Sequence, residues 1–240
     1  MRYIIRMFKA GVLTNGELQI SEEGVSQGSI CSPILSNVFA HFVLDQWIER
    51  DVKPRCKGKI RLFRFCDDAV ICCQLESDAL RLKEALGKRL TKYKLKLNEE
   101  KTKMINFRKI AGNKASFDFL GFTHYLGRSQ KGRIIPKLKT IGKRLRAKLK
   151  RVNEWARSIR SRLKLQDIWR LFCLKLRGHI NYYGVSFNIN QVQAFVYHAT
   201  RIMFKWLNRR SQRKSFNWEN FGKYMVRFPL PKVKVYHKLF

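Results

Sequence analysis

Two adjacent aspartates are the residues of this 240-residue chain best suited to chemistry. Asp67 and Asp68 lie between two apolar, β-prone runs, 60–65 and 70–75, where a turn chosen only for stability would carry Asn-Gly or Asp-Gly. Neighbouring carboxylates repel each other, and Mg²⁺, which prefers hard oxygen ligands, removes that repulsion. Such carboxylates hold two metal ions about 3.5–4 Å apart in phosphoryl-transfer sites. The pair predicts either a magnesium site of this kind or a solvated acidic turn.

A glycine-containing run precedes the aspartates. Residues 24–37 read Gly-Val-Ser-Gln-Gly-Ser-Ile-Cys-Ser-Pro-Ile-Leu-Ser-Asn. The glycines let the backbone approach a flat or charged ligand closely, and Gln27 offers both a donor and an acceptor. Alone, the run could be an ordinary junction between a loop and a helix. Ahead of an Asp-Asp hairpin, it predicts a substrate-binding loop that uses Gln27 and Gly28.

The net charge of +34 points to a polyanionic partner, of which nucleic acid is the commonest. The charge argues against an enzyme for an acidic ligand or a neutral metabolite. Residues 1–128 carry 23 basic and 14 acidic side chains, whereas residues 129–240 carry 28 and 3. The sequence therefore predicts two parts, 1–128, which still uses carboxylates, and 129–240, which mostly meets phosphate.

The elements that must position the aspartates are predicted from periodicity and turn residues. We expect a short amphipathic helix ending near Lys9, a hairpin at Asn15-Gly16 and a buried helix over 32–49. A tight hairpin then carries the aspartates, a helix follows that Ser77 can cap, and 95–107 has a strand pattern. This alternation predicts an α+β fold for the first part.

The second part is predicted to be helical. Apolar residues recur every three or four positions over 141–163, and further helices are expected near 166–177 and 191–206. The aromatic residues at helical spacing are predicted to be core: Trp155, Trp169, Tyr182, Tyr183 and Trp206. The basic faces predict either a solvated surface or contacts to RNA phosphates. The candidates for phosphate contact are Lys143, Arg144, Arg146, Lys148, Lys150, Arg151, Arg209, Arg210, Arg213 and Lys214.

Cysteine usage and hydropathy indicate the compartment. The six cysteines show no Cys-x-x-Cys spacing, so we expect reduced and mostly buried thiols rather than a zinc module or a disulfide framework. No apolar stretch approaches the length of a membrane helix, and Met1–Lys9 has no signal-peptide pattern. We therefore expect a protein of the cytoplasm, or equally of an organelle matrix, with no membrane partner.

Taken together, the motifs resemble those of reverse transcriptase and maturase proteins encoded by group II introns. The run at 24–37 resembles the family's Gly-x-Pro-Gln-Gly-x-x-x-Ser-Pro-x-Leu-x-Asn motif, and 65–68 resembles its Tyr-Ala-Asp-Asp box. Residues 97–102 and 119–122 are similar to the next palm motif and to the segment that grips the primer end. The helical part is similar to the thumb, or maturase domain, most clearly at 177–184.

The resemblance implies roles for individual residues. Asp67 and Asp68 would supply catalytic carboxylates, with Asp67 the stronger candidate as a metal ligand. Lys101 would lie near the nucleotide phosphates, where a cation could aid departure of pyrophosphate, although it could also be one more solvated lysine. The substrate-binding positions that the resemblance implies are Gln27, Gly28, Cys66, Leu120 and Gly121.

The resemblance also implies the fold and the partners. It implies a partial reverse-transcriptase palm, an antiparallel sheet with packed helices, over 1–128 and an all-α thumb bundle over 129–240. The partners would be structured intron RNA, an RNA template with a DNA primer, deoxynucleotides and Mg²⁺. The alternative is an RNA-binding maturase or RNA chaperone without catalysis.

The chain departs from the family pattern in several places. Ser26 stands where proline is usual, Ser29 where glycine is common, Cys66 where alanine is usual and His179 where tryptophan is usual. No residue matches the third metal-binding carboxylate of the family or its fingers region. We therefore expect a C-terminal portion that binds Mg²⁺ weakly by itself and depends on a separate N-terminal part, or a truncated or degenerate copy.

Overall fold

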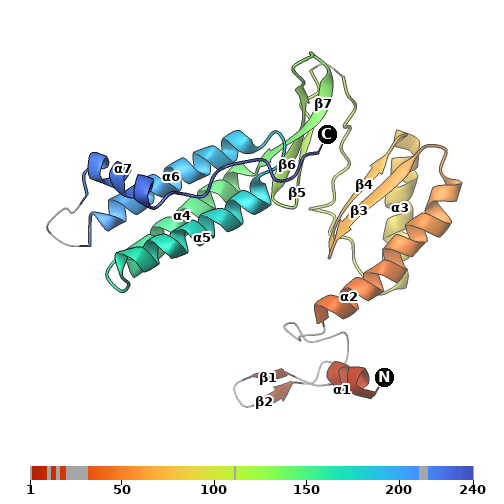
Figure 1. The fold of residues 1–240 in the computed structure, drawn as a ribbon. Coiled ribbons are helices and arrows are strands. Elements are labelled where there is room, and N and C mark those ends of the chain that lie inside the picture. The colour runs from red at the N-terminus through yellow and green to blue at the C-terminus, as the bar shows by residue number, and fades with distance from the viewer. Residues whose placement is uncertain are drawn as a thin grey trace. The chain divides into compact units, whose positions relative to one another are not determined.

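The computed structural model describes residues 2–9, 12–14, 17–19, 32–110, 112–210 and 216–239. The chain forms two compact units, Met1–Met104 and Ile105–Phe240 (Figure 1). Residues 116–119 and 122–128 belong to the second unit, where 122–128 pair with both 116–119 and a strand at 134–140. The first unit mixes helices and short strands as predicted. The prediction that residues 129–240 are all-α is wrong, because a strand at 134–140 completes an antiparallel sheet with residues 122–128. The described chain is of the α+β class.

The first unit begins with helix α1 (Arg2–Lys9) and the antiparallel pair β1 (Val12–Thr14) and β2 (Glu17–Gln19). These elements confirm the predicted helix and hairpin. Helix α2 (Ser32–Ala40) continues through two π-helical turns, His41–Asp45 and Ile48–Val52, into a 3₁₀ turn, Lys53–Arg55. Strands β3 (Ile60–Phe65) and β4 (Asp68–Cys73) and helix α3 (Glu76–Lys92) follow.

A small core holds the first unit together. Ile48, Ile60 and Leu82 are buried against one another, so the second π-turn and α3 pack on the β3–β4 hairpin. Asp78 is also buried, and its carboxylate accepts hydrogen bonds from the backbone of Lys57 and Gly58. This carboxylate anchors the turn that leads into β3.

The prediction that the helix over 32–49 is buried is wrong. No residue of α2 itself is buried, and Ile34 is 67% exposed. A helix needs apolar partners on each of its apolar sides, and a two-stranded sheet with one further helix covers only the positions around Val43 and Ile48. The exposed apolar side chains of this segment are Ile34, Val38, Phe39 and Phe42.

Three further local predictions for the first unit are wrong. Residues 95–107 form no strand, because Asn98 closes a turn in which its side chain accepts from the backbone N–H of Lys101. Ser77 does not cap α3, whose N-cap is Leu75. The described thiols are not mostly buried, since Cys66 and Cys72 are exposed and the others are half-buried.

The second unit combines a three-stranded antiparallel sheet with helices. The strands β5 (Ser116–Phe119), β6 (Phe122–Arg128) and β7 (Ile134–Thr140) lie in the order β5-β6-β7. Four helices follow: α4 (Gly142–Ile159), α5 (Leu165–Tyr183), α6 (Ile189–Leu207) and α7 (Trp218–Arg227). Sequence periodicity finds α4 to α6 but none of the three strands and not α7.

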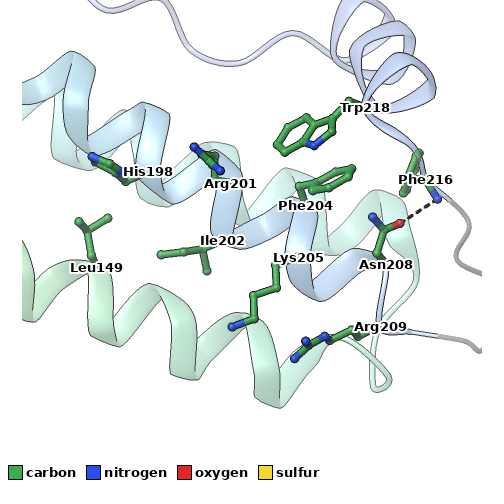
Figure 2. A pocket seen from close by; sticks show the side chains of 10 residues that line it. All are labelled: Leu149, His198, Arg201, Ile202, Phe204, Lys205, Asn208, Arg209, Phe216 and Trp218. Carbon is green, nitrogen blue, oxygen red and sulfur yellow. Dashed lines mark hydrogen bonds between the residues drawn. The ribbon is translucent and has the colours of Figure 1, made fainter.

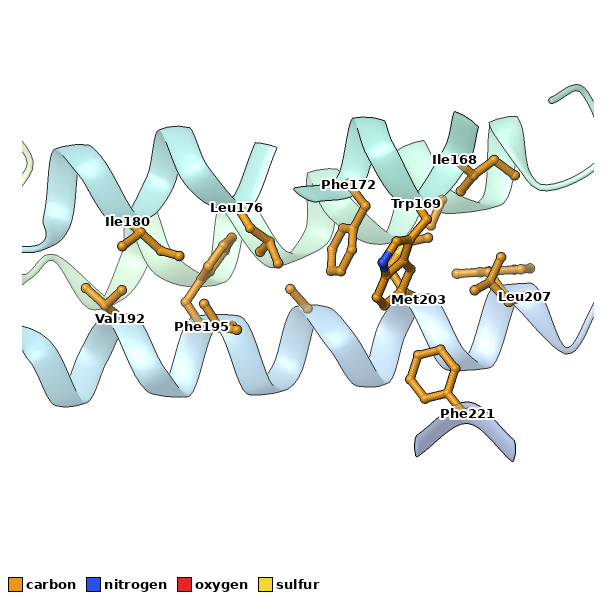
Figure 3. Packing of buried hydrophobic residues seen from close by; sticks show 14 of the residues in the cluster. Ile168, Trp169, Phe172, Leu176, Ile180, Val192, Phe195, Met203, Leu207 and Phe221 are labelled. Atoms are coloured by element: carbon orange, nitrogen blue, oxygen red, sulfur yellow. The ribbon is translucent and has the colours of Figure 1, made fainter. Parts of the chain in front are cut away.

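The core of the second unit lies between α4, α5, α6 and α7. Figure 3 shows side chains of α5, such as Phe172 and Leu176, pointing toward Phe195 and Met203 of α6. Phe221 of α7 lies against the same cluster and is fully buried. Trp169, Tyr183 and Trp206 are core residues as predicted, whereas Tyr182 is 53% exposed. The helices of this unit are thereby fixed around a large aromatic core.

Candidate active site and nucleic-acid interface

The two aspartates lie where β3 turns into β4. The strands pair antiparallel with Phe65 opposite Asp68, so only Cys66 and Asp67 form the loop. Cys66 has a φ of 53°, a left-handed conformation that is costly for a residue with a Cβ. Asp67 and Asp68 are both exposed. The hairpin therefore presents two carboxylates to solvent at a tip with a strained backbone.

Alternation along the strands separates two faces of this hairpin. Because directly paired residues share a face, Asp68 lies on the same face as Phe65, Phe63 and Val70. Phe63 and Phe65 are exposed on that face. Arg64 points to the opposite face, toward the π-helical turn that follows α2. The carboxylate of Asp68 and the guanidinium of Arg64 thus leave the sheet in opposite directions.

Arg64 ties the hairpin to the helix that precedes it. Its Nε and Nη2 donate to the two carboxylate oxygens of Asp45, each at 2.7 Å. Its Nη1 donates to Asn37 Oδ1 and to the Cys66 carbonyl, each at 2.9 Å. The guanidinium therefore joins the Asn of the Ser-Pro-Ile-Leu-Ser-Asn run to the loop that carries Asp67. We call Asn37, Asp45, Arg64 and Cys66 the hairpin tether.

The charges of the hairpin tether stabilise each other. Hydrogen bonding to Arg64 lowers the pKa of Asp45, with a smaller contribution from His41, and the same pair raises the pKa of Arg64. Two parallel N–H···O bonds between a guanidinium and a carboxylate fix orientation as well as distance. The ion pair therefore gives Asp45 a structural role.

Lys101 lies in an exposed turn of the same unit. Its backbone N–H donates to Asn98 Oδ1 at 3.1 Å, and Thr102 donates to the Asn98 carbonyl. Among the described residues, no hydrogen bond or ion pair joins the Lys101 ammonium to Asp67 or Asp68. Its role near the nucleotide phosphates stays a prediction.

Four of the predicted site residues lie outside the described part of the chain. They are Gln27 and Gly28 in the predicted substrate loop and the basic residues Arg213 and Lys214. The structure neither supports nor contradicts their roles.

In the second unit, Leu120 and Gly121 form the two-residue turn between β5 and β6. Both have positive φ, 48° and 85°, which favours the twist of a two-residue hairpin. The Tyr182 hydroxyl donates to the Leu120 carbonyl at 2.8 Å, and Gly121 lies against the Tyr183 hydroxyl. The turn that resembles the primer-gripping segment is thus held by the Tyr-Tyr pair of the thumb-like motif.

A small basic pocket adjoins this turn. It has a volume of about 310 Å³ and is lined by Arg144, Lys148 and Arg151 of α4 and by Tyr182 and Tyr183 of α5. The Lys148 ammonium lies 4.3 Å from the centroid of the Tyr183 ring. Burial lowers the pKa of Lys148, and the nearby charges of Arg151 and Arg144 lower it further. An anion bound here would offset the repulsion among these three cations.

Some of the other predicted phosphate contacts are exposed, and others bind groups within the protein. Lys143, Arg146 and Arg209 are exposed, while Lys150 forms a loose ion pair with Glu154 at 4.0 Å. Arg210 is half-buried and donates to the Leu163 carbonyl at 3.0 Å, so it fixes the loop after α4. A long basic face on α4 therefore remains available to phosphate.

Sequence reasoning missed the residues that position the site. Arg64 and Asn37 were not singled out for their own roles, and Tyr182 was assigned to the core. Arg64 directly precedes the Phe-Cys-Asp-Asp run and lies on the face of the hairpin opposite to Asp68. The alternation of side chains along a strand could have indicated this supporting position.

The donors at the hairpin suit a hard divalent cation. Two adjacent, exposed carboxylates offer oxygen ligands, and Mg²⁺ prefers oxygen. Within the described ranges, no group of three or more His, Cys, Asp or Glu side chains could hold a metal ion. Asp67 and Asp68 would thus be two of the ligands, and Mg²⁺ held there would neutralise charge during phosphoryl transfer.

Comparison with known proteins identifies the family of this chain. No curated protein matches it. The family model described as reverse transcriptase (RNA-dependent DNA polymerase) matches residues 3–124, half of the chain. The match includes the hairpin tether, both aspartates, Lys101 and the Leu120-Gly121 turn. The chain therefore belongs to the reverse transcriptase (RNA-dependent DNA polymerase) family.

Proposed function

We propose that this chain takes part in RNA-directed DNA synthesis and in intron splicing of the group II type. Asp67 and Asp68 are the metal-binding carboxylates of the proposed reaction, with Mg²⁺ as the cofactor. The observation that carries the proposal is the hairpin tether, because it fixes the backbone on which both carboxylates stand. A solvated acidic turn would not need a bidentate guanidinium bound to two distant positions in the chain.

The proposed reaction needs a third carboxylate besides the hairpin pair. In the proposal it comes from outside the described residues or from a partner polypeptide that also supplies a fingers region. The remaining partners are an RNA template with a DNA primer and deoxynucleotides, which would meet the hairpin, and structured intron RNA, which would meet α4. The proposal places the protein in the cytoplasm or an organelle matrix. No helix in the described ranges is long and apolar enough to cross a membrane.

Primer extension tests the catalytic assignment. The full chain is mixed with a polypeptide carrying the fingers and first palm motif of a group II intron reverse transcriptase, and extension of a DNA primer on RNA is followed with Mg²⁺. We expect Asp67→Asn to lower the rate by about 100-fold or more, because a metal ligand is lost at unchanged volume. Glu84→Gln, the same change on the exposed face of α3, should leave the rate unaltered.

Equal extension by the wild type and Asp67→Asn would overturn the catalytic role. A chain that never extends primers but binds RNA points to the second candidate function, an RNA-binding maturase or RNA chaperone. The exposed cations of α4 and its basic pocket favour that candidate. In this case RNA binding should survive Asp67→Asn and Asp68→Asn and should weaken steeply with salt.

A further inference from the structure

A groove in the second unit, distinct from the small basic pocket, combines an aromatic floor with a basic rim. It lies along α4 and α6 at the start of α7 and has a volume of about 860 Å³ (Figure 2). Ligand sites of proteins commonly have volumes of a few hundred to about 1,000 Å³. None of its lining residues belongs to the pocket beside the Leu120-Gly121 turn. The groove is therefore a separate feature of this unit.

The floor of the groove suits a flat, apolar group. Leu149 of α4 and Ile202 of α6 line it at one end, and Phe204 and Phe216 line it at the other. The rings of Phe204 and Trp218 stack with their centroids 3.7 Å apart and their planes at 20°. Trp218 is 53% exposed, although it is a large aromatic residue next to a core helix. The stack with Phe204 thus leaves a substantial part of the indole open to a ligand.

The rim of the groove carries positive charge only. Arg201 and Lys205 of α6 and Arg209, just after the helix, are exposed, and no lining residue is acidic. Each of these cations lies over a neighbouring aromatic ring: Arg201 over Tyr197, and Lys205 and Arg209 over Trp206. These contacts hold the charges in place beside the apolar floor. The groove therefore suits a ligand with a flat base and anions on either side.

The end of the groove at α7 is fixed by hydrogen bonds. Asn208 Oδ1 accepts from the Phe216 backbone N–H at 2.8 Å, and the Asn217 side chain accepts from the Asn220 N–H at 2.7 Å. The first contact holds Phe216 beside the end of α6, as the dashed line in Figure 2 shows. The second caps α7 and so fixes the position of Trp218. The aromatic floor is therefore positioned before a ligand arrives.

We propose that this groove binds an unpaired nucleotide of a folded RNA, with its base against Trp218 and Phe204 and its flanking phosphates on Arg201, Lys205 and Arg209. The inference rests on the RNA-binding part of the proposed function. It adds that the groove selects RNAs with an unpaired nucleotide. A regular duplex hides its bases and can reach only the cations. An RNA with a bulged nucleotide can fill the groove as well.

Two labelled RNAs test this proposal: a hairpin with a perfect stem and the same hairpin with one bulged nucleotide. Anisotropy titrations at fixed salt should show that the full chain binds the bulged RNA about tenfold more tightly. Trp218→Ala should remove that preference without weakening binding to the perfect stem, and Trp218→Phe should retain most of it. A crosslink from 4-thiouridine in the bulge to the Trp218 peptide should accompany the preference.

A second variant keeps the test decisive if Trp218→Ala loosens α7. The double variant Arg201→Gln and Lys205→Gln leaves the aromatic floor intact and should lower the salt slope for the bulged RNA by about two. Lys223→Gln together with Arg227→Gln removes the same charge from α7 outside the groove and should leave the slope unaltered.

Equal affinity of the wild type for the two RNAs would overturn this inference and leave the proposed function standing. Failure of the wild type to bind either RNA would overturn the RNA-binding function itself. Vesicles with anionic phospholipid provide a further comparison. If Trp218→Ala abolished vesicle binding but not the preference for the bulge, the groove would be a membrane contact and the nucleotide assignment would be wrong.

Discussion

At the scale of single residues, Arg64 holds the hairpin in place, since its guanidinium donates hydrogen bonds to Asp45, Asn37 and the Cys66 carbonyl. Replacing it by alanine leaves the Asp45 carboxylate, which is 26% exposed, without its bidentate partner. We expect Arg64→Ala to lower the free energy of unfolding at pH 7 by about 2 kcal/mol, less than for a fully buried pair. Urea denaturation measures this loss.

The pH dependence of the unfolding free energy lost in Arg64→Ala shows whether the ion pair, rather than packing of the side chain, causes the loss. Because Arg64 lowers the pKa of folded Asp45, the stabilisation is present above the unfolded pKa of about 4 and is lost as the pH falls below it. The stabilities of wild type and Arg64→Ala should therefore converge as the pH falls from about 4 through the lowered pKa of folded Asp45. A constant difference over this range would contradict the assignment. Lys88→Ala, which breaks an exposed pair with Glu84, should change neither stability nor its pH dependence.

His179 is the other residue with an unusual environment. Its ring is buried and stacks on Phe195 and Tyr183, and neither ring nitrogen has a hydrogen-bond partner among the residues that the structure describes. Burial, together with the charge of Lys148, lowers the pKa of His179 to about 3. A buried donor and acceptor without partners cost free energy that an aromatic hydrocarbon ring would avoid.

We therefore expect His179→Phe to raise the free energy of unfolding by about 1 kcal/mol at pH 7. Because the folded pKa lies below the unfolded value of about 6.5, the wild type should lose about 2 kcal/mol between pH 6.5 and 5 through this residue. His179→Phe should lack that loss in thermal or urea unfolding. His198→Phe, at an exposed position of α6, provides the control and should keep it. Identical pH profiles for wild type and His179→Phe would show that the imidazole is not held neutral.

At the scale of elements, the turn between β5 and β6 determines how the sheet meets α4 and α5. A Cβ on Gly121 would lie 2.9 Å from the Tyr183 hydroxyl and 3.3 Å from Arg144 Nη1, and φ there is +85°. Gly132 has a similar φ of +74°, but no atom lies within 4 Å of an added Cβ. The two glycines form a matched pair that separates backbone strain from steric overlap.

We expect Gly132→Ala to cost about 1 kcal/mol of unfolding free energy, which is the left-handed backbone strain alone. Gly121→Ala should cost about 2 kcal/mol or more, because Tyr183 and Arg144 must also move. Parallel urea titrations of both variants measure the difference. Equal losses would show that the turn is not packed against α5 as described.

The elements also show which features the sequence could reveal. The hairpin around Asp67 was predictable because β-prone runs flank it, and α4 to α6 were predictable from their apolar repeats. Burial of the helix from Ser32 was not, because it depends on which other elements cover the helix. The strand expected at 95–107 failed because the Asn98 side chain competes for backbone hydrogen bonds. The hairpin tether joins residues 19 to 27 positions apart, and no local pattern marks such contacts.

At the scale of the whole molecule, positive charge is concentrated in residues 129–240. Lys143, Arg146 and Lys150 follow one another at helical spacing on exposed positions of α4. We expect the triple change of these residues to Gln to weaken binding to a structured RNA and to lower the slope of log K against log salt by up to about three. Anisotropy titrations from 50 to 300 mM salt, concentrations chosen to span the usual range, measure the slope.

The control for this prediction removes the same charge from the first unit. Lys83, Lys88 and Lys92 lie on exposed positions of α3, and their triple change to Gln should leave the slope unaltered. If both triple variants lowered the slope equally, RNA would be attracted by net charge rather than by the face of α4.

The exposed apolar side of α2 has a consequence for the life of the protein in a cell. Ile34 and Val38 of α2, and Phe42 in the π-helical turn that follows, are exposed to water, whereas the second unit buries a broad aromatic core. Chaperones and quality-control proteases recognise apolar segments that a fold leaves uncovered. We therefore expect the turnover of the polypeptide to be decided at α2, and the well-packed helices around Phe172 to outlast it as a proteolytic remnant.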